Sequence, residues 1–484
     1  MKPNFKKNFK SSILVILSIV LAIGLVGCTP KDIEDGEVEQ QKEVVSNNGD
    51  IRFLEVDGEI YISIKDAFES VGGEYLEEKD KIKIAKDKDE LIINLQENSI
   101  ILNGEDIQLS DEDIKVEKDL VYVSIEVLNE VLDAKTIFNE EENKVEIRTE
   151  IPLEYAETFS VKYLKGGVKK IELEDGKTLI LMPEGKEVPE EYNGESVVNI
   201  PIEKAMLGTT VFACDLRAIE ELDSIIAVTS DIDVWEIQEV IDNMESGKTK
   251  FVGKNKSPDY ELIYSLKPDV AFITGGRAGN QETMEKFDEL GISYVPGTSY
   301  LELHPLGRME WMKLTAAFYD KEDIAEKHFN NAVKNINELQ GQFSSEEKPK
   351  VIWGRISKGK ASVPLAESYA AKMIEIAGGD YVFKDANLES KDISIEEFYD
   401  KGKDADIFIW ETMGPAPESL EAMIEETPSL ADFKTVKEKN VWRLDDDYWQ
   451  SIDKTDVIVK SLAAILYPDK FDQNEIKHYL RYTE

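Results

Sequence analysis

Hydrophobic and polar residues alternate along residues 51–149 in a pattern that occurs twice. The segment EIYISIKDAFESVGGEYLEEKDKIKI at 59–84 aligns with LVYVSIEVLNEVLDAKTIFNEEENKVEI at 120–147. Each copy predicts a strand, then a short amphipathic helix capped by a serine or a neighbouring residue, then a strand of period two. Between the copies, Asn103-Gly104 separates two alternating apolar stretches, which is the strongest short signal for a β-hairpin. The pattern therefore predicts a small α+β repeat module.

From about residue 155 the periodicity changes. A β-rich stretch turns at 165–167 and 175–176, and after it short apolar runs alternate with helical segments such as Ser257–Leu266 and Asn280–Leu290. This alternation predicts an α/β architecture with mostly parallel strands. The runs expected to form strands are Thr210–Ala213, Ser224–Val228, Val270–Thr274, Ser293–Val295, Val351–Trp353, Ile407–Trp410 and Val441–Leu444.

One helical stretch is much longer than the others. Residues 308–343 contain no proline and a single late glycine, and they lie midway between the two sets of predicted strands. A long helix that joins two Rossmann-like lobes explains this arrangement better than one continuous sheet. We expect an N-lobe over 155–307, the linking helix over 308–343 and a C-lobe over 349–484.

The N-terminus is typical of an export signal. Four lysines precede an apolar run, Ile13–Val26, that is too short for a comfortable membrane span. The run ends in LVGC at 25–28, which resembles a bacterial lipobox. The resemblance implies that residues 1–27 are removed as a lipoprotein signal peptide and that Cys28 is lipidated, which would anchor the chain on the extracellular face of a cell membrane, in a Gram-positive type of envelope. An ordinary signal peptide with an incidental cysteine is the alternative. Residues 28–50 are polar and acidic, which predicts a tether.

The composition narrows the classes of function. The chain has 484 residues with 57 Lys+Arg against 99 Asp+Glu, a formal charge of −42. A surface this acidic disfavours binding to nucleic acid and to anionic lipid headgroups, because both need a basic face. The 42% hydrophobic content suffices for packed cores. The second cysteine, Cys214, has no partner for an intrachain disulfide and is expected to be a small buried hydrophobe.

Scarce arginines and tryptophans gather after the predicted strands. Ligands of open α/β lobes bind beyond the carboxyl ends of the strands. The chain has only eight arginines and six tryptophans. An arginine fork holds carboxylate, catecholate or hydroxamate oxygens, and a tryptophan offers an apolar face to a bulky ring. The alternatives are a surface ion pair for each arginine and core packing for each tryptophan. The residues expected to bind a ligand are Arg217, Arg277, Trp353, Arg355, Trp410, Tyr448 and Trp449.

The chain beyond residue 155 resembles the substrate-binding proteins of ABC importers for iron complexes and vitamin B12. The resemblance rests on an ordered set of motifs: Ser257–Asp269, LGISYVP at 290–296, AGG at 377–379, ISIEEF at 393–398 and DAD at 404–406. It implies a fold of the class III periplasmic-binding-protein type, with two lobes joined by a rigid helix. It also implies that one surface glutamate on each lobe pairs with arginines of the permease. The matching positions are Glu261 and Glu396, with Glu397 as a competitor for the second role.

The repeat module resembles the copper amine oxidase N-terminal-like domain of exported proteins. Residues 51–149 contain no His, Cys or Met, so they offer none of the side chains that copper prefers. We expect the module, over 51–150, to act as a spacer or a stalk that contacts the cell wall.

Together these features predict a monomeric receptor that delivers an iron–siderophore complex to an ABC permease dimer with its ATPase. The histidines His304, His328 and His478 do not form a set with carboxylates, so a chelated metal is favoured over a directly coordinated ion, and no cofactor is expected. Two alternatives stay open: a cobalamin or haem receptor, with a tyrosine or His304 as axial haem ligand, and a structural or adhesive surface protein. No nucleophile elbow, phosphate-binding loop or metal-ligand helix motif occurs, so an enzyme is not expected.

Overall fold

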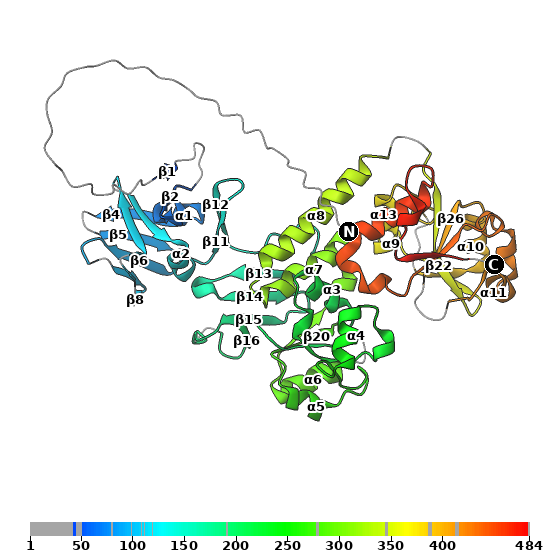
Figure 1. Ribbon diagram of the computed structural model, residues 1–484, viewed down its shortest axis with the longest axis horizontal. Helices are drawn as coiled ribbons and strands as arrows, with labels where there is room; N and C mark the ends of the chain where they lie inside the picture. Colours follow the sequence, from blue (N-terminus) through cyan, green and yellow to red (C-terminus); the bar gives the residue numbers. More distant parts are fainter. Residues whose placement is uncertain are drawn as a thin grey trace, which may run out of the picture.

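The chain forms four successive units, coloured from blue to red along the sequence in Figure 1. They are the repeat module, a connecting sheet, an N-lobe and a C-lobe. The computed structural model describes residues 42–44 and 51–482, except 79–80, 98, 108, 111, 119, 190–191, 277–279, 344–346, 386–389 and 412–415. The signal peptide and Cys28 lie outside the described residues, as does nearly all of the tether. Within the described part of the chain, no helix combines the length and the apolar character needed to cross a membrane.

The repeat module consists of two five-stranded antiparallel sheets and a two-stranded ribbon. Both repeats form the expected strand–helix–strand unit, and the hydroxyls of Ser63 and Ser124 cap the two helices by accepting from backbone N–H groups at 3.3 and 3.4 Å. Asn103 and Gly104 have φ values of 53° and 90°, the left-handed conformation of a tight hairpin turn. The first repeat is β3 (Glu59–Ser63), α1 (Ile64–Ser70) and β4 (Glu74–Glu78); the second is β10 (Leu120–Ser124), α2 (Ile125–Val131) and β11 (Lys135–Asn139). The other strands are β1 (Lys42–Val44), β2 (Phe53–Val56), β5 (Lys81–Lys86), β6 (Asp89–Asn94), β7 (Ser99–Leu102), β8 (Glu105–Ile107), β9 (Ile114–Glu117) and β12 (Lys144–Arg148).

The connecting sheet lies between the module and the N-lobe. Its strands β13 (Phe159–Tyr163), β14 (Lys169–Leu173) and β15 (Thr178–Pro183) are antiparallel, with turns at the two expected positions. The fourth strand, β16 (Ser196–Ile200), pairs with β15 in parallel.

Ion pairs join the module and the connecting sheet to the linking region. The Nζ of Lys169, which is buried, lies 2.5 Å from a carboxylate oxygen of Glu322, and the Nζ of Lys135 lies 3.1 Å from the other oxygen. Arg148 of the module reaches Glu326 at 2.6 Å. Several charged contacts therefore hold the module against the rest of the molecule, in addition to the covalent connection of the chain.

The N-lobe is a parallel five-stranded sheet with the strand order β19-β18-β17-β20-β21, flanked by helices. Its strands are β17 (Ala205–Leu207), β18 (Ile225–Val228), β19 (Lys250–Phe251), β20 (Val270–Thr274) and β21 (Tyr294–Gly297). Its helices are α3 (Val211–Ala218), α4 (Gln238–Glu245), α5 (Tyr260–Leu266) and α6 (Gln281–Leu290), with a one-turn 3-10 helix at each of Leu222–Ser224, Ile232–Val234 and Ser299–Leu301.

The C-lobe is a mixed sheet with the order β25-β23-β22-β26-β27-β28, and β24 pairs with β22. Its strands are β22 (Lys350–Ser357), β23 (Lys360–Ser362), β24 (Asp380–Tyr381), β25 (Asp392–Ser394), β26 (Ile407–Trp410), β27 (Val441–Leu444) and β28 (Tyr479–Arg481). Its helices are α9 (Tyr369–Ile376), α10 (Ile395–Gly402), α11 (Leu420–Glu426), α12 (Lys434–Lys437) and α13 (Thr455–Leu466). The two lobes confirm the expected α/β fold class.

The linking region differs from the expected single helix over 308–343. It is formed by two helices, α7 (Pro305–Ala317) and α8 (Glu322–Gln340), which Figure 1 shows beside each other between the lobes. The first helix ends at Ala317, and the break before Glu322 contains Asp320, whose φ of 54° is left-handed and not helical. Helix α7 is buried over nearly its whole length, whereas α8 is amphipathic. The sequence pattern missed the break because neither proline nor glycine marks it.

The run Thr210–Ala213 is not a strand, contrary to the sequence prediction. It begins helix α3, and the strand at this place in the order is the shorter run Ala205–Leu207. Six of the eight residues of α3 are buried, so its sequence is apolar on nearly all sides and resembles a buried strand over four residues. Cys214 is buried as expected, but on this helix.

Candidate ligand-binding site

A cavity of about 460 Å³ lies between the two lobes. This volume falls within the range of roughly 300–1,000 Å³ that is usual for small-molecule sites. Several of its lining residues end or follow parallel strands: Thr274 ends β20, Gly297 ends β21 and Glu411 follows β26. The cavity thus occupies the place where open α/β sheets bind ligands. The lining residues are Thr209, Val211, Phe212, Thr274, Gly297, Ser299, Tyr300 and Arg308 from the first half, and Trp353, Ser362, Val363, Pro364, Ser368, Tyr369, Ala370, Lys391, Glu411, Trp449 and Ile452 from the second.

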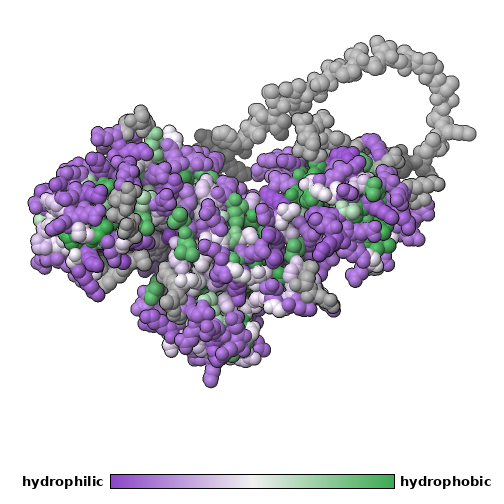
Figure 2. All heavy atoms as spheres, turned by 180° about the vertical axis from the view of Figure 1, so that it is seen from behind, coloured by the Kyte–Doolittle hydropathy of each residue, from purple (hydrophilic) through white to green (hydrophobic). Residues whose placement is uncertain are grey.

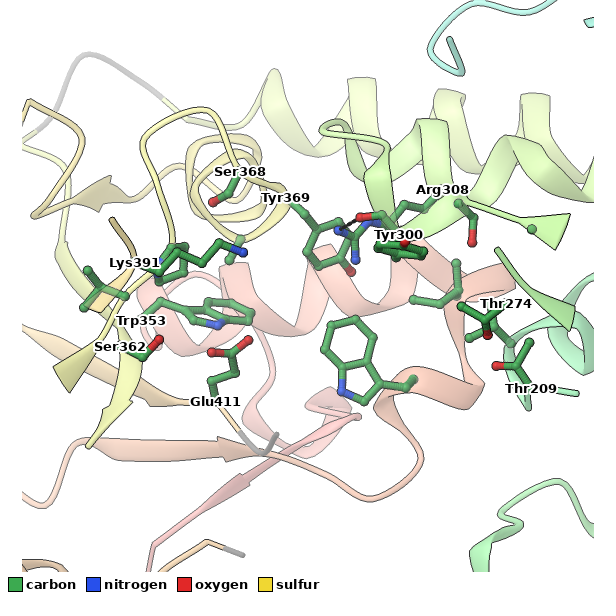
Figure 3. A pocket seen from close by; sticks show the side chains of 18 of the residues that line it. Thr209, Thr274, Tyr300, Arg308, Trp353, Ser362, Ser368, Tyr369, Lys391 and Glu411 are labelled. Atoms are coloured by element: carbon green, nitrogen blue, oxygen red, sulfur yellow. Dashed lines mark hydrogen bonds between the residues drawn. The ribbon is translucent and has the colours of Figure 1, made fainter. Parts of the chain in front are cut away.

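Arg308 supplies a positive charge at one end of the cavity, as Figure 3 shows. It lies in the second turn of α7, whose N-terminus is capped by the ring nitrogen of His304. Its guanidinium donates to the backbone carbonyls of Glu302 at 3.1 Å and of Tyr300 at 2.9 Å, and lies 4.0 Å from the ring centre of Tyr369. Among the described residues, no carboxylate oxygen lies within ion-pair distance of this guanidinium. Burial lowers the pKa of Arg308, which marks it as a desolvated cation.

Aromatic rings form the walls between the ends of the cavity. Trp353 projects from β22, Tyr369 from the first turn of α9, and Trp449 from the segment after β27. The rings of Tyr369 and Trp449 lie 6.1 Å apart, and the Tyr369 hydroxyl lies 3.1 Å from that of Tyr448. Such walls offer a broad apolar surface to a bulky ligand.

Glu411 and Lys391 lie at the opposite end from Arg308, beside Trp353 (Figure 3). The backbone N–H of Glu411 donates to Gly354 at 3.0 Å, which holds the residue at the end of β26. Burial raises the pKa of Glu411, although Arg355, Lys391 and Arg308 each act to lower it. The site therefore carries one carboxyl group among several cations, and its balance is positive in a strongly acidic protein.

The positive balance of the cavity contrasts with the formal charge of −42 of the whole chain. The face seen in Figure 2 is largely hydrophilic on every unit, with hydrophobic residues in small scattered patches. Within the described residues, no group of three or more His, Cys, Asp or Glu side chains is arranged to hold a metal ion.

Comparison with known proteins agrees with this geometry. The profile of the periplasmic binding protein family matches residues 217–448. An uncharacterized lipoprotein of Methanocaldococcus jannaschii is 33% identical over 298 residues, which span 59% of this chain and 70% of the relative. The chain belongs to the periplasmic binding protein family, of the type associated with iron complexes and vitamin B12.

Further comparisons extend to the module and to solved structures. The profile of the copper amine oxidase N-terminal domain matches residues 43–147 of this periplasmic binding protein, so both resemblances found in the sequence are confirmed. A second uncharacterized lipoprotein of the same archaeon is 25% identical over 342 residues, 68% of this chain and 86% of the relative. An ABC transporter substrate-binding protein from Listeria monocytogenes aligns at 19% identity with a TM-score of 0.44, over 55% of this chain and 100% of that one.

The structure brings two of the predicted ligand-binding residues of this periplasmic binding protein to the cavity. Trp353 and Trp449 line it. Tyr448 lies directly behind, fully buried, with its hydroxyl against Tyr369. Arg355, on β22, does not line the cavity but contributes positive charge near Glu411. Whether these residues bind a ligand stays a prediction.

The other predicted residues lie elsewhere. Arg217 is on α3, because the strand expected before it is a helix, and its guanidinium pairs with Asp453 and does not face the cavity. Trp410 is 4% exposed and packs in the C-lobe core, with its ring 5.7 Å from that of Phe408. Arg277 lies outside the described residues.

Sequence reasoning missed Arg308, Tyr300 and Tyr369. None of these follows a predicted strand directly, and the sequence pattern places Arg308 at the start of the linking helix. A usable signal was the helix start at His304-Pro305. Where the beginning of such a helix faces the space between the lobes, the residues just after it, such as Arg308, reach that space. His304 itself is occupied: it caps α7 and stacks on Tyr155 with ring centres 4.5 Å apart, and burial lowers its pKa to about 4.

The two candidate docking glutamates lie on the outside of the lobes. Glu261 is in the first turn of α5 and Glu396 in the first turn of α10, and both are exposed. In Figure 1, α5 lies at the lower tip of the N-lobe and α10 on the outer side of the C-lobe. A role in docking stays a prediction.

Proposed function

We propose that this periplasmic binding protein captures a bulky anionic iron chelate of siderophore type and delivers it to an ABC permease. The observation that carries the proposal is Arg308: a desolvated guanidinium that faces the inter-lobe cavity, with no carboxylate partner among the described residues. A buried cation left unpaired in the empty protein is costly, so it is expected where a ligand supplies the anion.

The walls of the cavity support a ligand with a broad apolar surface. Trp353, Tyr369 and Trp449 line it with aromatic rings, while Arg308 and Lys391 supply positive charge. Hydroxamate and catecholate chelates combine anionic oxygens around the metal with organic arms of this kind, and the arginine fork suits their oxygens. The metal would arrive fully chelated, so the protein needs no ligand of its own to hold it.

Tryptophan fluorescence tests the proposal, because two tryptophans lie on the cavity wall. We expect saturable quenching by at least one ferric hydroxamate or ferric catecholate chelate, and weaker or no quenching by cyanocobalamin and haem. Saturable quenching by cyanocobalamin or haem alone would show that the ligand is one of these compounds and not a siderophore complex, and the class of receptor would stand. No quenching by any of the four compounds would refute the proposed function.

Docking on a permease would use Glu261 and Glu396, one on each lobe. Exposed glutamates in the first turns of other helices of the same lobes, Glu282 on α6 and Glu421 on α11, give matched controls. With the permease and its ATPase in vesicles, Glu261→Ala with Glu396→Ala should reduce stimulation of ATP hydrolysis at least tenfold. The pair Glu282→Ala with Glu421→Ala should leave it unchanged. Equal effects of the two pairs would exclude a special role for the first.

Membrane attachment would use a lipid on Cys28, as the lipobox-like motif predicts. Two M. jannaschii relatives are named as lipoproteins, which agrees with this proposal. In a cell that processes lipoproteins, Cys28→Ser should release the protein into the medium or leave its signal uncleaved. Unchanged membrane attachment of that variant would refute lipidation at this residue.

A further inference from the structure

One segment of the C-lobe is fastened to the N-lobe. Residues 448–454 follow β27 and form two short 3-10 helices, Tyr448–Gln450 and Ile452–Lys454. Two residues of this segment, Trp449 and Ile452, line the inter-lobe cavity. The position of this part of the cavity wall is therefore set by whatever holds the segment.

Arg217 of α3 in the N-lobe makes three hydrogen bonds with the segment, and His328 of α8 adds one to the backbone carbonyl of Asp453 at 2.7 Å. The Nε of Arg217 donates to one carboxylate oxygen of Asp453 at 2.9 Å, and its Nη2 donates to the other oxygen at 2.5 Å. The same Nη2 donates to the backbone carbonyl of Gln450 at 2.8 Å. Burial alone would lower the pKa of Arg217, but its hydrogen bond to Asp453 and the charge of that carboxylate raise it. The pair is a two-pronged charge-assisted contact, and the side chain of Asp453 is only 2% exposed.

Gln450 fastens the segment to a second part of the N-lobe. Its side-chain carbonyl accepts from the backbone N–H of Glu236 at 2.9 Å, and its side-chain amide donates to the carbonyl of Val234 at 2.8 Å. Gln450 is 5% exposed, so these bonds form away from water. We call Arg217, Asp453 and Gln450 the clamp.

We propose that Arg217 is a positioning residue of the ligand site: through the clamp it sets the place of Trp449 and Ile452 against the N-lobe. Its charge is neutralised by Asp453, and its side chain does not line the cavity, so direct attraction of an anion is not its role. Removing one partner of a buried pair leaves the other charge uncompensated, and the segment then gains freedom to move. The clamp thus couples ligand affinity to the contact between the lobes.

The clamp and a direct ligand contact make opposite predictions for Asp453→Asn. If Arg217 bound the ligand, releasing it from Asp453 would strengthen binding of an anionic chelate. If Arg217 acts through the clamp, Asp453→Asn and Arg217→Gln should weaken binding by similar factors, and the double variant should be no weaker than either single one. Arg148→Gln is a matched control: Arg148 also pairs with a carboxylate, that of Glu326, its side chain is also 24% exposed, and it lies at the module–α8 contact.

The experiment uses the full-length protein and two readouts. Amide hydrogen exchange over residues 446–456, without ligand, measures the freedom of the segment. Fluorescence titration with the tightest-binding ferric chelate of the panel measures affinity; this arm rests on the proposed function. We expect Arg217→Gln and Asp453→Asn each to speed exchange in the segment at least tenfold and to weaken affinity at least tenfold. Arg217→Lys should recover part of both effects, and Arg148→Gln should show neither.

Four results would overturn the proposal. Unchanged exchange over 446–456 in Arg217→Gln would show that the clamp does not hold the segment. Faster exchange with unchanged affinity would show that the segment does not position the ligand, while the proposed function stands. Tighter binding by Asp453→Asn would return Arg217 to a direct ligand contact. If no ferric chelate binds the unaltered protein, the proposed function fails, and the positioning role falls with it even where exchange supports the clamp.

Discussion

Replacement of Arg308 by glutamine should separate ligand binding from stability. Two of the five N–H donors of the guanidinium are used by the carbonyls of Tyr300 and Glu302. The other three have no hydrogen-bond acceptor among the described residues and are available to a ligand in the cavity. The substitution removes the charge while keeping a polar side chain of intermediate length.

The magnitude for binding follows from the number of charge-assisted bonds. Each hydrogen bond to a charged group contributes about 1.5–3 kcal/mol. Loss of one or two of them to an anionic chelate should cost about 3 kcal/mol, which corresponds to roughly 150-fold weaker binding.

Arg308→Gln should change the free energy of unfolding only slightly, as a small loss or a small gain of stability. Burial lowers the pKa of Arg308, so the folded protein holds a desolvated cation that glutamine would replace by a neutral amide. The lost contact with the Tyr369 ring and the lost carbonyl bonds act the other way. We expect the free energy of unfolding to change by no more than about 1 kcal/mol.

Fluorescence titration and thermal unfolding of the same samples measure both quantities, with Arg148→Gln as the control away from the cavity. The reasoning would be refuted if Arg308→Gln bound the ferric chelate within threefold of the unaltered protein. It would also be refuted if the loss of affinity came with a large loss of thermal stability, because the side chain would then support the fold and not the ligand.

Three further predictions concern packing and capping. Lys169→Met should destabilise the protein by about 2–4 kcal/mol, because it removes a buried partner of Glu322. Chemical denaturation measures this loss, and a value below about 1 kcal/mol would contradict a tight ion pair. Ser124→Ala should lower the free energy of unfolding by about 1 kcal/mol, because the helix cap is lost. An unchanged midpoint in denaturant unfolding would contradict this. Gly297→Ala should lower the free energy of unfolding by about 1–3 kcal/mol and weaken chelate binding, since the new Cβ would lie 2.4 Å from the Phe212 ring in the cavity wall. Unchanged affinity in the fluorescence titration would disprove the close fit.

Local sequence patterns predicted most elements of the fold because those patterns act over short distances. The strands Val270–Thr274, Ile407–Trp410 and Val441–Leu444 form as expected, since each is a mainly apolar run that pairs in parallel with a neighbouring buried strand. The exceptions are α3 and the break at Asp320. A helix buried on nearly all sides has no polar stripe, so its periodicity disappears, and a left-handed aspartate leaves no trace in a hydrophobic pattern.

The sequence by itself determined the family, the two lobes and the repeat module. It located Trp353 and Trp449, because residues at the ends of parallel strands meet at one edge of a sheet. Only the tertiary structure decided which arginine faces the cavity. Arg217 and Arg308 are both arginines on helices, and only the contacts made across the chain distinguish them: Asp453 neutralises the first, whereas the second has only backbone carbonyls and an aromatic ring beside it among the described residues. Charge pairing of this kind joins residues more than 200 positions apart, so no local pattern encodes it.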